Sequence, residues 1–419
     1  MLDVYLHGAP VGSITQTEGG LLAFQYRERA LDEPETYRLS VRLPVRPDPY
    51  GHDAAMAFFE NLLPEGEGRD LIAQARQFSA GDVPGLLGMV GGECAGAVSL
   101  WPTGVVPPAE PAYRLLSEAE VAALFGREYG AAATDMIVAQ RLSMSGVQQK
   151  MVFRRRDDRL ELPLHGSPSN VIVKRAKSMY PGLVLNELAC MRLLRACGFQ
   201  GAESQAIGGE RLLFESRRYD REEDEGGALR RLHQEDLCQA TGHRSAQKYQ
   251  ARGGPGYGEI AVVIRRHSVD PLRDLETVAR WALFNVLVGN NDAHAKNLSL
   301  LYSPEGLRLA PIYDVVSTEA YPQIDRHFAL DLGGQKTAEG LHPVALDKFA
   351  RSLGMRGPAV ARFGHDLVER ARGELDAVLN GVAAAHGHGP VLDQLRDLVM
   401  RRAELMAAWL QSADRRGGR

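Results

Sequence analysis

NNDAHAKN, residues 290–297, and the later segment APIYDVV, residues 310–316, decide how this sequence is interpreted. Together they place Asp292 five residues before Asn297 and a second aspartate, Asp314, further along the chain. Phosphoryl transfer needs a carboxylate that accepts a hydroxyl proton and oxygen ligands for Mg²⁺. The spacing therefore predicts that Asp292 is a catalytic base and that Asn297 and Asp314 are metal ligands.

Other interpretations of these residues stay open at this point. Asp292 with His294 also supplies the carboxylate and imidazole of half a metallohydrolase site, although no further histidine pair lies nearby. Bracing the loop by hydrogen bonding is the simpler role for His294. Asp314 follows a strand-like segment, where an aspartate often only caps a turn or a helix. Its spacing from the other acids favours a metal ligand.

Three further pieces occur upstream in the order that is typical of a protein kinase. SGVQQK, residues 145–150, precedes the strand-like NVIVKRA with Lys174, and Glu187 follows in the helical LNELACM. A lysine at the end of an apolar strand needs a compensating charge, which phosphate oxygens and a helix carboxylate supply. Taken alone, Lys174 is better explained as a strand-end lysine that reaches solvent, and SGVQQK equally well as a plain turn. The order of the parts favours a nucleotide site.

The composition of the chain limits the possible functions. The 419 residues exceed what one hydrophobic core organises and indicate two or three packed units. A net charge of −4 leaves no general basic field, so any DNA contact is expected from a local patch or through a partner. The four cysteines have no CxxC spacing and are expected to be buried free thiols in a reducing compartment.

The N-terminus and the apolar segments predict a cytoplasmic protein. MLDVYLHGAP lacks the basic region and the apolar core of a secretory signal. The longest apolar run, near residues 281–288, is too short to cross a bilayer. No membrane contact is expected.

The pattern along the chain predicts an α+β, bilobal, protein-kinase-like fold in three parts. Residues 1–105 form a small sheet with helices, 106–270 an α/β nucleotide-binding part, and 271–419 a mostly helical lobe with the catalytic loop. The Pro-rich segment 102–112 marks the first boundary. The expected strands cover 2–8, 21–27, 37–45, 96–102, 170–176 and 212–220, and the expected helices 55–66, 69–78, 117–125, 185–198, 271–289, 366–385 and 393–412.

At these residues the sequence resembles the HipA family of serine/threonine kinases, the toxins of bacterial toxin–antitoxin pairs. FFENLLPEG, residues 58–66, is similar to the N-terminal subdomain of that family. The shared motifs cover nearly the whole chain, and chance agreement among so many ordered motifs is very small. In order they are SMSGVQQK, VIVK, Asn186-Glu187, Tyr219-Asp220-Arg221, Gln234-Glu235-Asp236, GGPGYG, DAHAKN and Tyr313-Asp314.

The resemblance implies ATP and Mg²⁺ as cofactors and assigns roles by position. It makes Asp292 the base, Asn297 and Asp314 the Mg²⁺ ligands, and Lys174 the contact to the α- and β-phosphates, with Glu187 in a structural role. The implied nucleotide-binding residues are Ser145, Gly146, Val147, Gln148, Gln149, Lys150, Lys174, Arg217, Arg218, Tyr219, His294 and Lys296. The family's V-E-R-F-D-R strand reads SRRYDR here, so adenine contacts are expected from backbone groups of residues 217–219.

The resemblance also implies regulation and partners. Ser143 matches the autophosphorylated serine of the family, and Ser145 is a second candidate. A phosphate adds about two negative charges beside a loop that must approach ATP, which favours an open, inactive loop. A HipB-like helix-turn-helix antitoxin is the expected partner, DNA is contacted through it, and an aminoacyl-tRNA synthetase is the expected substrate.

Two alternatives to a toxin kinase stay open. One is a kinase-like phosphotransferase that acts on a small molecule. The other is a non-catalytic co-repressor that binds DNA together with its antitoxin. The intact set of lysine, asparagine and two aspartates counts against the second alternative, because a protein without catalytic activity is free to lose them.

Overall fold

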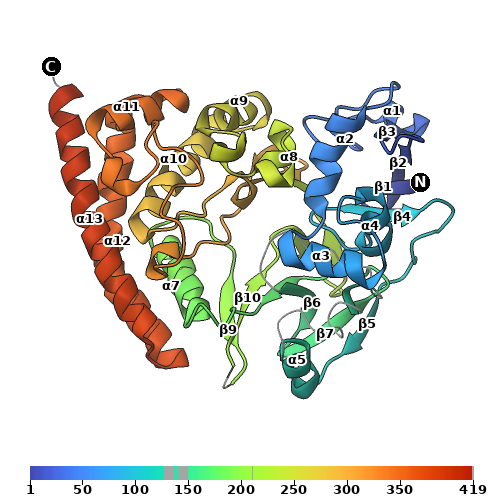
Figure 1. Ribbon diagram of the computed structural model, residues 1–419, viewed down its shortest axis with the longest axis horizontal. Coiled ribbons are helices and arrows are strands. Elements are labelled where there is room, and N and C mark those ends of the chain that lie inside the picture. Colours follow the sequence, from blue (N-terminus) through green and yellow to red (C-terminus); the bar gives the residue numbers. More distant parts are fainter. Residues whose placement is uncertain (127–135, 139, 141–149, 210, 418–419) are drawn as a thin grey trace. The chain divides into compact units, whose positions relative to one another are not determined.

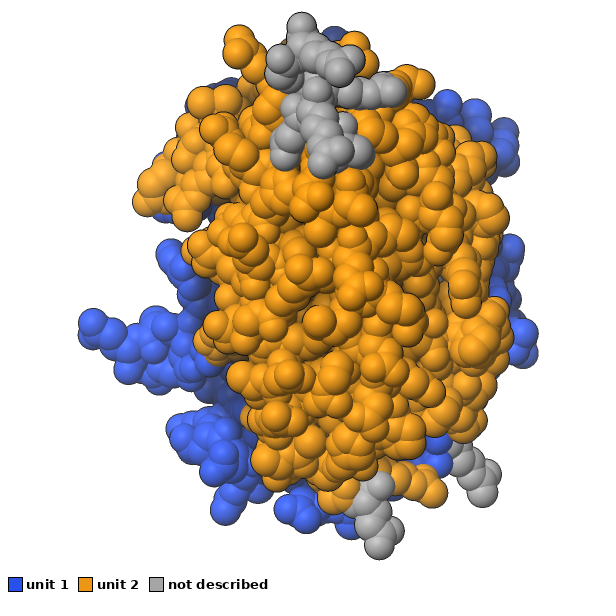
Figure 2. All heavy atoms as spheres, turned by 90° about the vertical axis from the view of Figure 1, so that its left-hand side faces the viewer, with its two compact units in different colours: residues 1–175, 215–245, 300–304 blue, residues 176–214, 246–299, 305–419 orange. Residues whose placement is uncertain are grey.

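The chain forms two compact units, each assembled from segments that are separated in the sequence. The computed structural model describes residues 1–126, 136–138, 140, 150–209 and 211–417 (Figure 1). Unit 1 comprises Met1–Arg175, Glu215–Ser245 and Leu300–Pro304, and unit 2 comprises Ala176–Phe214, Ala246–Ser299 and Glu305–Arg419 (Figure 2). The chain combines β-sheets with helices, which confirms the predicted α+β class.

Unit 1 begins with an antiparallel four-stranded sheet in the order β3-β2-β1-β4. Its strands are β1 (Leu2–Leu6), β2 (Ala9–Gln16), β3 (Leu22–Tyr26) and β4 (Val98–Pro102). Three helices share its hydrophobic core: α2 (His52–Phe59), α3 (Gly66–Ala75) and α4 (Val83–Val90). The rings of Phe24, Phe58 and Phe59 are almost fully buried in this core, and Phe59 packs on Phe24 with ring centroids 5.3 Å apart.

The strand predicted at residues 37–45 is not formed. Its backbone groups bond to side chains instead of to a neighbouring strand: Leu39 N–H donates to the Tyr26 hydroxyl over 3.0 Å, and Val41 N–H donates to Glu235 over 2.9 Å. Leu39 and Leu43 are nevertheless buried. The alternating pattern that suggested a strand therefore reflects burial of this segment and not pairing in a sheet.

A second sheet in unit 1 runs in the order β5-β7-β6-β8-β10. Its strands are β5 (Ala112–Leu115), β6 (Lys150–Arg156), β7 (Arg159–Leu164), β8 (Val171–Lys174) and β10 (Leu213–Arg217). Helix α5 (Glu118–Leu124) starts at a capping box between Ser117 and Glu120. The hairpin of β11 (Arg221–Glu223) and β12 (Leu229–Arg231) follows, and β13 (Gln234–Asp236) leads into α8 (Leu237–Thr241).

Unit 2 is mostly helical and is organised around α10 (Pro271–Val288), which packs against three other helices. Asp270 caps its start, Pro271 occupies the first helical position, and Gly289 ends it in the left-handed conformation. The two longest helices, α12 and α13, lie side by side (Figure 1). The other main elements of unit 2 are α7 (Leu183–Ala196), β9 (Ser204–Ile207), α9 (Tyr257–His267), β15 (Gly306–Leu309), α11 (Pro343–Ser352), α12 (Gly357–His386) and α13 (Pro390–Gly417).

Among the described residues, no helix combines the length and the apolar character needed to cross a membrane. The strands predicted at 96–102 and 170–176 and the helices at 117–125, 185–198 and 271–289 are confirmed. Helix α4 was not predicted, because VPGLLGMV contains a proline and two glycines that usually indicate a turn; an Asp82 cap makes Pro84 compatible with the first turn. Strand β2 and helices α9 and α11 were also missed. The three-part division at residues 105 and 270 stays a prediction.

Candidate active site

The predicted catalytic loop leaves α10 through a glycine that the structure requires. Gly289 has a φ of +64°, and a Cβ at this position would lie 2.9 Å from the side chain of Leu398. Asn290 then turns the loop back on the helix. Its amide donates to Oδ1 of Asn285 over 2.8 Å, and its own Oδ1 accepts the N–H of Asp292 over 3.2 Å. The backbone of Asp292 is therefore held by the end of α10.

The carboxylate of Asp292 is exposed and has one hydrogen-bond partner among the described residues. The hydroxyl of Tyr249 donates to Oδ1 over 2.7 Å, which leaves Oδ2 to accept a proton. Tyr249 itself is held in place through a bridge: Gln250 N–H donates to Ala329 O, and Ala329 N–H donates to Asn291 O, both over 2.9 Å. The tyrosine and the aspartate are thus positioned by the same segment.

The two predicted metal ligands lie next to each other. Nδ2 of Asn297 donates to Oδ2 of Asp314 over 2.9 Å, and Oδ1 of Asn297 accepts the N–H of His294 over 2.9 Å. This second bond closes the loop into a short helix, η4 (Ala295–Asn297). Asp314 has a φ of 60°, a conformation that is costly for a residue other than glycine and that often occurs at functional sites.

The donors of this pair fit a magnesium ion. Amide and carboxylate oxygens are the hard ligands that Mg²⁺ prefers, and Mg²⁺ sites commonly use only one or two carboxylates, with water and phosphate oxygens completing the shell. In the part of the chain that the structure describes, no group of three or more His, Cys, Asp or Glu side chains is arranged to hold a metal ion. The roles of Asn297 and Asp314 stay predictions.

The segments around the metal pair are fixed by polar contacts. The Tyr313 hydroxyl donates to the backbone oxygen of Lys296 over 2.6 Å. Because Tyr313 directly precedes Asp314, this bond connects the segment of the predicted metal ligand to the catalytic loop. Asn186 on α7 exchanges two hydrogen bonds of 2.9 Å with the backbone of Ser317. Glu187, the next residue of α7, is buried. The helix of the predicted structural glutamate is thereby tied to the segment that follows Asp314.

The two predicted phosphate-binding lysines are neighbours in the sheet of unit 1. Lys150, at the start of β6, pairs directly with Lys174, at the end of β8, in an antiparallel register. Lys174 is buried and Lys150 is partly buried. A direct pairing of two lysines is unusual in a sheet, because like charges on opposite positions are destabilising; phosphate binding by Lys174 stays a prediction. The predicted loop residues Ser145, Gly146, Val147, Gln148 and Gln149, and the predicted phosphorylation site Ser143, lie outside the described residues.

The predicted adenine-contacting segment differs from the expectation at Arg218. Its side chain is buried in an ion network, and its backbone N–H donates to Asn170 O over 2.8 Å, so neither group is available to a nucleotide. Arg217 is exposed, and the partly buried Tyr219 donates its hydroxyl to Gln234 over 2.5 Å. A nucleotide contact stays a prediction for Arg217, Tyr219 and the backbone oxygen of Arg218.

The ion network around Arg218 was not predicted from the sequence. Glu93, fully buried, accepts from Arg218, Arg221 and Arg231 over 3.0, 2.9 and 2.6 Å, and Asp220 pairs with the first two of these arginines. Burial alone raises the pKa of Glu93, but the three arginine charges and the Ser169 amide outweigh it and lower the pKa to about 2. The only sequence signal was a glutamate after two glycines in an apolar stretch, GMVGGECAG, with arginine-rich segments far along the chain.

Comparisons with known proteins show which family the sequence belongs to. Residues 142–375 match the sequence model of the HipA-like C-terminal domain, and residues 2–101 match that of the HipA N-terminal domain. The chain is 34% identical over 419 residues to "Putative kinase Y4mE" of Sinorhizobium fredii, with 97% of this chain and 98% of that protein covered. It is 30% identical over 313 residues to the serine/threonine-protein kinase toxin HipA of Shewanella oneidensis, with 71% of each covered.

The fold resembles that of HipA in a solved complex of Shewanella oneidensis HipA, HipB and operator DNA. The TM-score is 0.85 with 23% identity, and the alignment covers 99% of both chains. The chain is thus a protein of the kinase-like α+β class. Because the HipA-like C-terminal domain alone covers more than half of its length, the chain belongs to the HipA family.

Proposed function

We propose that this chain is an ATP- and Mg²⁺-dependent serine/threonine protein kinase that acts as the toxin of a toxin–antitoxin pair. The observation that carries the proposal is the contact of Asn297 with Asp314, in a loop that also presents the exposed carboxylate of Asp292. Membership of the HipA family supports it, as do the names of the relatives.

The proposed mechanism assigns each residue a chemical task. Oδ2 of Asp292 accepts the proton of the substrate hydroxyl, while Tyr249 fixes the carboxylate through Oδ1. Asn297 and Asp314 hold Mg²⁺, which when bound neutralises negative charge on the phosphate oxygens of ATP. Lys174 binds the α- and β-phosphates, with its cross-strand neighbour in support.

The substrate and the regulation follow from the family resemblance. The proposed substrate is an aminoacyl-tRNA synthetase, whose phosphorylation inhibits translation and arrests growth. Autophosphorylation of Ser143, or of Ser145, switches the kinase off, because the added negative charge repels the loop from the phosphates of ATP.

The proposed partner is a HipB-like antitoxin in the cytoplasm. The Shewanella oneidensis protein with the same fold was solved together with HipB and operator DNA. We infer that this chain likewise binds a helix-turn-helix antitoxin and contacts DNA through it. Its net charge of −4 supports an indirect contact, since DNA binding by the chain itself would favour a basic surface.

The proposal is tested by incubating the purified full-length protein with ATP and Mg²⁺, alongside Asp292→Asn. Phosphate is located by intact mass and peptide sequencing. We expect phosphate on Ser143 or Ser145 in the native protein, a loss of rate of at least about 10³-fold in the variant, and no labelling when Mg²⁺ is chelated.

Two results contradict the proposal in different ways. Absence of both labelling and an ATP-induced rise in melting temperature points to the non-catalytic co-repressor. ATP binding with turnover on a metabolite, but without protein labelling, points to a small-molecule kinase.

A further inference from the structure

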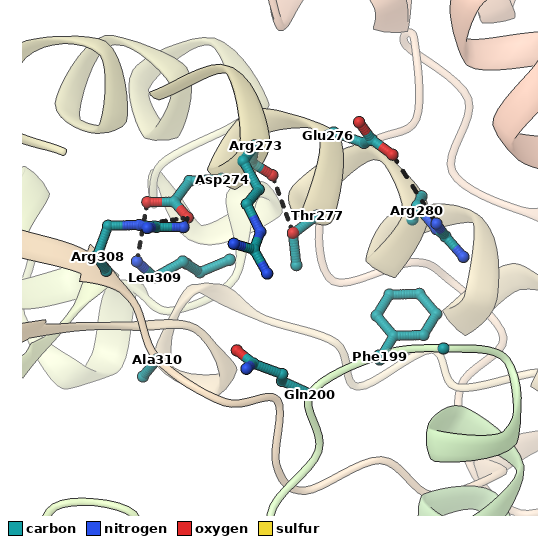
Figure 3. Close-up of a pocket in the computed structure, with 11 residues that line it drawn as sticks. Phe199, Gln200, Arg273, Asp274, Glu276, Thr277, Arg280, Arg308, Leu309 and Ala310 are labelled. Atoms are coloured by element: carbon teal, nitrogen blue, oxygen red, sulfur yellow. Dashed lines mark hydrogen bonds and ion pairs between the residues drawn. The ribbon is translucent and has the colours of Figure 1, made fainter. Parts of the chain in front are cut away.

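A polar cavity of about 340 Å³ lies within unit 2, and none of the proposed catalytic or metal-binding residues lines it (Figure 3). Its walls are the first turns of α10, the Gly198–Gln200 segment that follows α7, and the end of β15. We propose that this cavity is a binding site for the phosphate group of a small molecule. The site is independent of the proposed kinase activity.

Three arginines line the cavity, and the exposed side chain of one of them, Arg273, has no partner among the described residues. It extends from α10 towards Gln200 on the opposite wall (Figure 3). Neither side chain has a hydrogen-bond or ion-pair partner within the described parts of the chain. A guanidinium group and an amide group therefore face the same space with all their donors available.

Arg308 is held at one side of the cavity by a carboxylate that is already fully used. Its guanidinium lies 3.3 Å from Asp274, which is buried and also accepts from the Ser268 hydroxyl over 2.6 Å and from Leu309 N–H over 3.0 Å. Asp274 therefore fixes the orientation of Arg308. Because its oxygens already accept these hydrogen bonds, Asp274 is a poor partner for a positively charged ligand. Nη2 of Arg308 also lies 3.8 Å from Asp270, and Nη1 has no hydrogen-bond partner among the described residues, which leaves that nitrogen for an anion.

Arg280 occupies the other side and is incompletely paired. One Nη donates to Cys197 O over 3.0 Å, and its acidic neighbours Glu276 and Asp366 are more distant, at 3.8 and 3.5 Å. Its Nε is buried without a hydrogen-bond partner in the described residues. The guanidinium packs over the ring of Phe199 at 5.3 Å, which fixes its position.

The lining thus places three guanidinium groups against two carboxylates. Asp274 and Glu276 pair with Arg308 and Arg280, which also lie 3.8 Å from Asp270 and 3.5 Å from Asp366, respectively. The exposed guanidinium of Arg273 has no ion-pair partner among the described residues. Guanidinium groups bind phosphate oxygens through paired, charge-assisted hydrogen bonds, and the amide of Gln200 adds a neutral donor. A volume of about 340 Å³ is at the lower end of the range for small-molecule sites, so it suits one small phosphate compound and not a large cofactor.

The test is a titration of the full-length protein, without ATP, with inorganic phosphate and separately with glycerol 3-phosphate. Arginine Nε–H signals are followed by NMR. We expect saturable binding at one site per chain, weakened at least about ten-fold by Arg273→Met. Arg266→Met, on the exposed surface of α9 and away from the cavity lining, removes the same charge and should leave binding within about two-fold.

Every outcome of this experiment bears on the proposal. Tighter binding of glycerol 3-phosphate than of phosphate identifies an ester ligand, and equal binding identifies the free ion; both support a phosphate site. Binding that does not saturate, that survives Arg273→Met, or that both variants weaken equally overturns it. Gln200→Leu provides a second check, with a smaller loss of affinity expected because it removes a neutral donor.

Discussion

Tyr249 has the most direct influence on the proposed catalytic base at the scale of single residues. Its hydroxyl is the one described partner of the Asp292 carboxylate, at 2.7 Å. Tyr249→Phe removes this bond and lets the carboxylate rotate, so we expect the initial rate of autophosphorylation to fall about ten-fold. The KM for ATP should not change, because the hydroxyl has no role in nucleotide binding. Rates measured over a range of ATP concentrations separate the two effects.

A matched control is Tyr180→Phe, which removes a tyrosine hydroxyl that bonds to nothing in the described residues of the chain. This variant should keep the native rate. An unchanged rate in Tyr249→Phe, or a rise in KM for ATP at constant kcat, would show that Tyr249 does not position the base.

At the scale of elements, Glu93 connects the end of α4 to β11 and β12 through Arg221 and Arg231. Glu93→Gln removes the central negative charge of a buried network: Arg231 loses its carboxylate, and Arg218 and Arg221 keep only Asp220. Breaking a buried ion pair from one side costs about 3–5 kcal/mol, and we expect a loss of this size in the free energy of unfolding. Denaturant titration monitored by fluorescence measures it.

The control for this charge effect is Glu222→Gln on the same hairpin. Glu222 pairs with Arg230, but both side chains are more than half exposed, so the expected loss is below about 0.5 kcal/mol. Equal losses for the two glutamates would mean that burial of the network contributes little. The contrast depends on solvent access, since both residues form ion pairs with arginine.

At the scale of the whole molecule, two buried groups of unit 1 give opposite dependences of stability on pH. Burial raises the pKa of Glu235 to about 7, although Ser40, Tyr302 and Val41 donate to it, and burial lowers the pKa of His233 to about 4. The folded protein binds a proton at Glu235 more readily than the unfolded chain, so this contribution to stability increases as pH falls from 7 to 4.5. His233 is neutral in the fold and is protonated more readily when unfolded, so its contribution is lost as pH falls from 6.5 to 4.

These two effects nearly cancel between pH 7 and 5, where each amounts to about 2 kcal/mol. We therefore expect Glu235 and His233 together to contribute little net change in stability over this window. Glu235→Gln keeps an acceptor for the neighbouring donors but removes the titration, so its stability should fall by about 2 kcal/mol from pH 7 to pH 5. Parallel profiles for the native protein and the variant would contradict the assignment.

The C-terminal helix also supports the catalytic loop, which is a second effect at the scale of the molecule. Arg402 on α13 is buried and pairs with Glu319 over 2.6 Å, and Glu319 in turn accepts from Nδ2 of Asn291, next to the proposed base. Arg402→Met leaves Glu319 buried without its cation. We expect a loss of about 3 kcal/mol of stability in unit 2 and a slower autophosphorylation.

Arg401→Met tests whether this effect is specific, because the neighbouring arginine is exposed. It should alter stability by less than about 0.5 kcal/mol and leave the kinase rate unchanged. If the two variants have the same stability and the same kinase rate, the ion pair between Arg402 of α13 and Glu319 does not support the catalytic loop. Melting curves and initial rates on the same preparations distinguish the two cases.

Most of the short-range features of this chain could be predicted from its sequence. The aspartate and asparagine of the catalytic loop lie five positions apart. Helix α10 shows its cap and its first-turn proline in consecutive residues, and a glycine directly after its last residue. Such features are decided by local backbone geometry, and local patterns therefore reveal them. The structure also brings Asn297 and Asp314 into contact, as the spacing suggested.

Only the tertiary structure decided the features that join distant segments. Arg218 was expected to contact the nucleotide, yet Glu93 draws it into a buried network, and residues 37–45 bond to Tyr26 and Glu235 instead of forming a strand. The contact of Tyr249 with Asp292 is of the same kind. The sequence by itself determined the family, the α+β class and the order of the kinase motifs. The partner of each buried charge and of each free hydroxyl depends on which segments burial brings together, and the spacing of residues along the chain does not encode that.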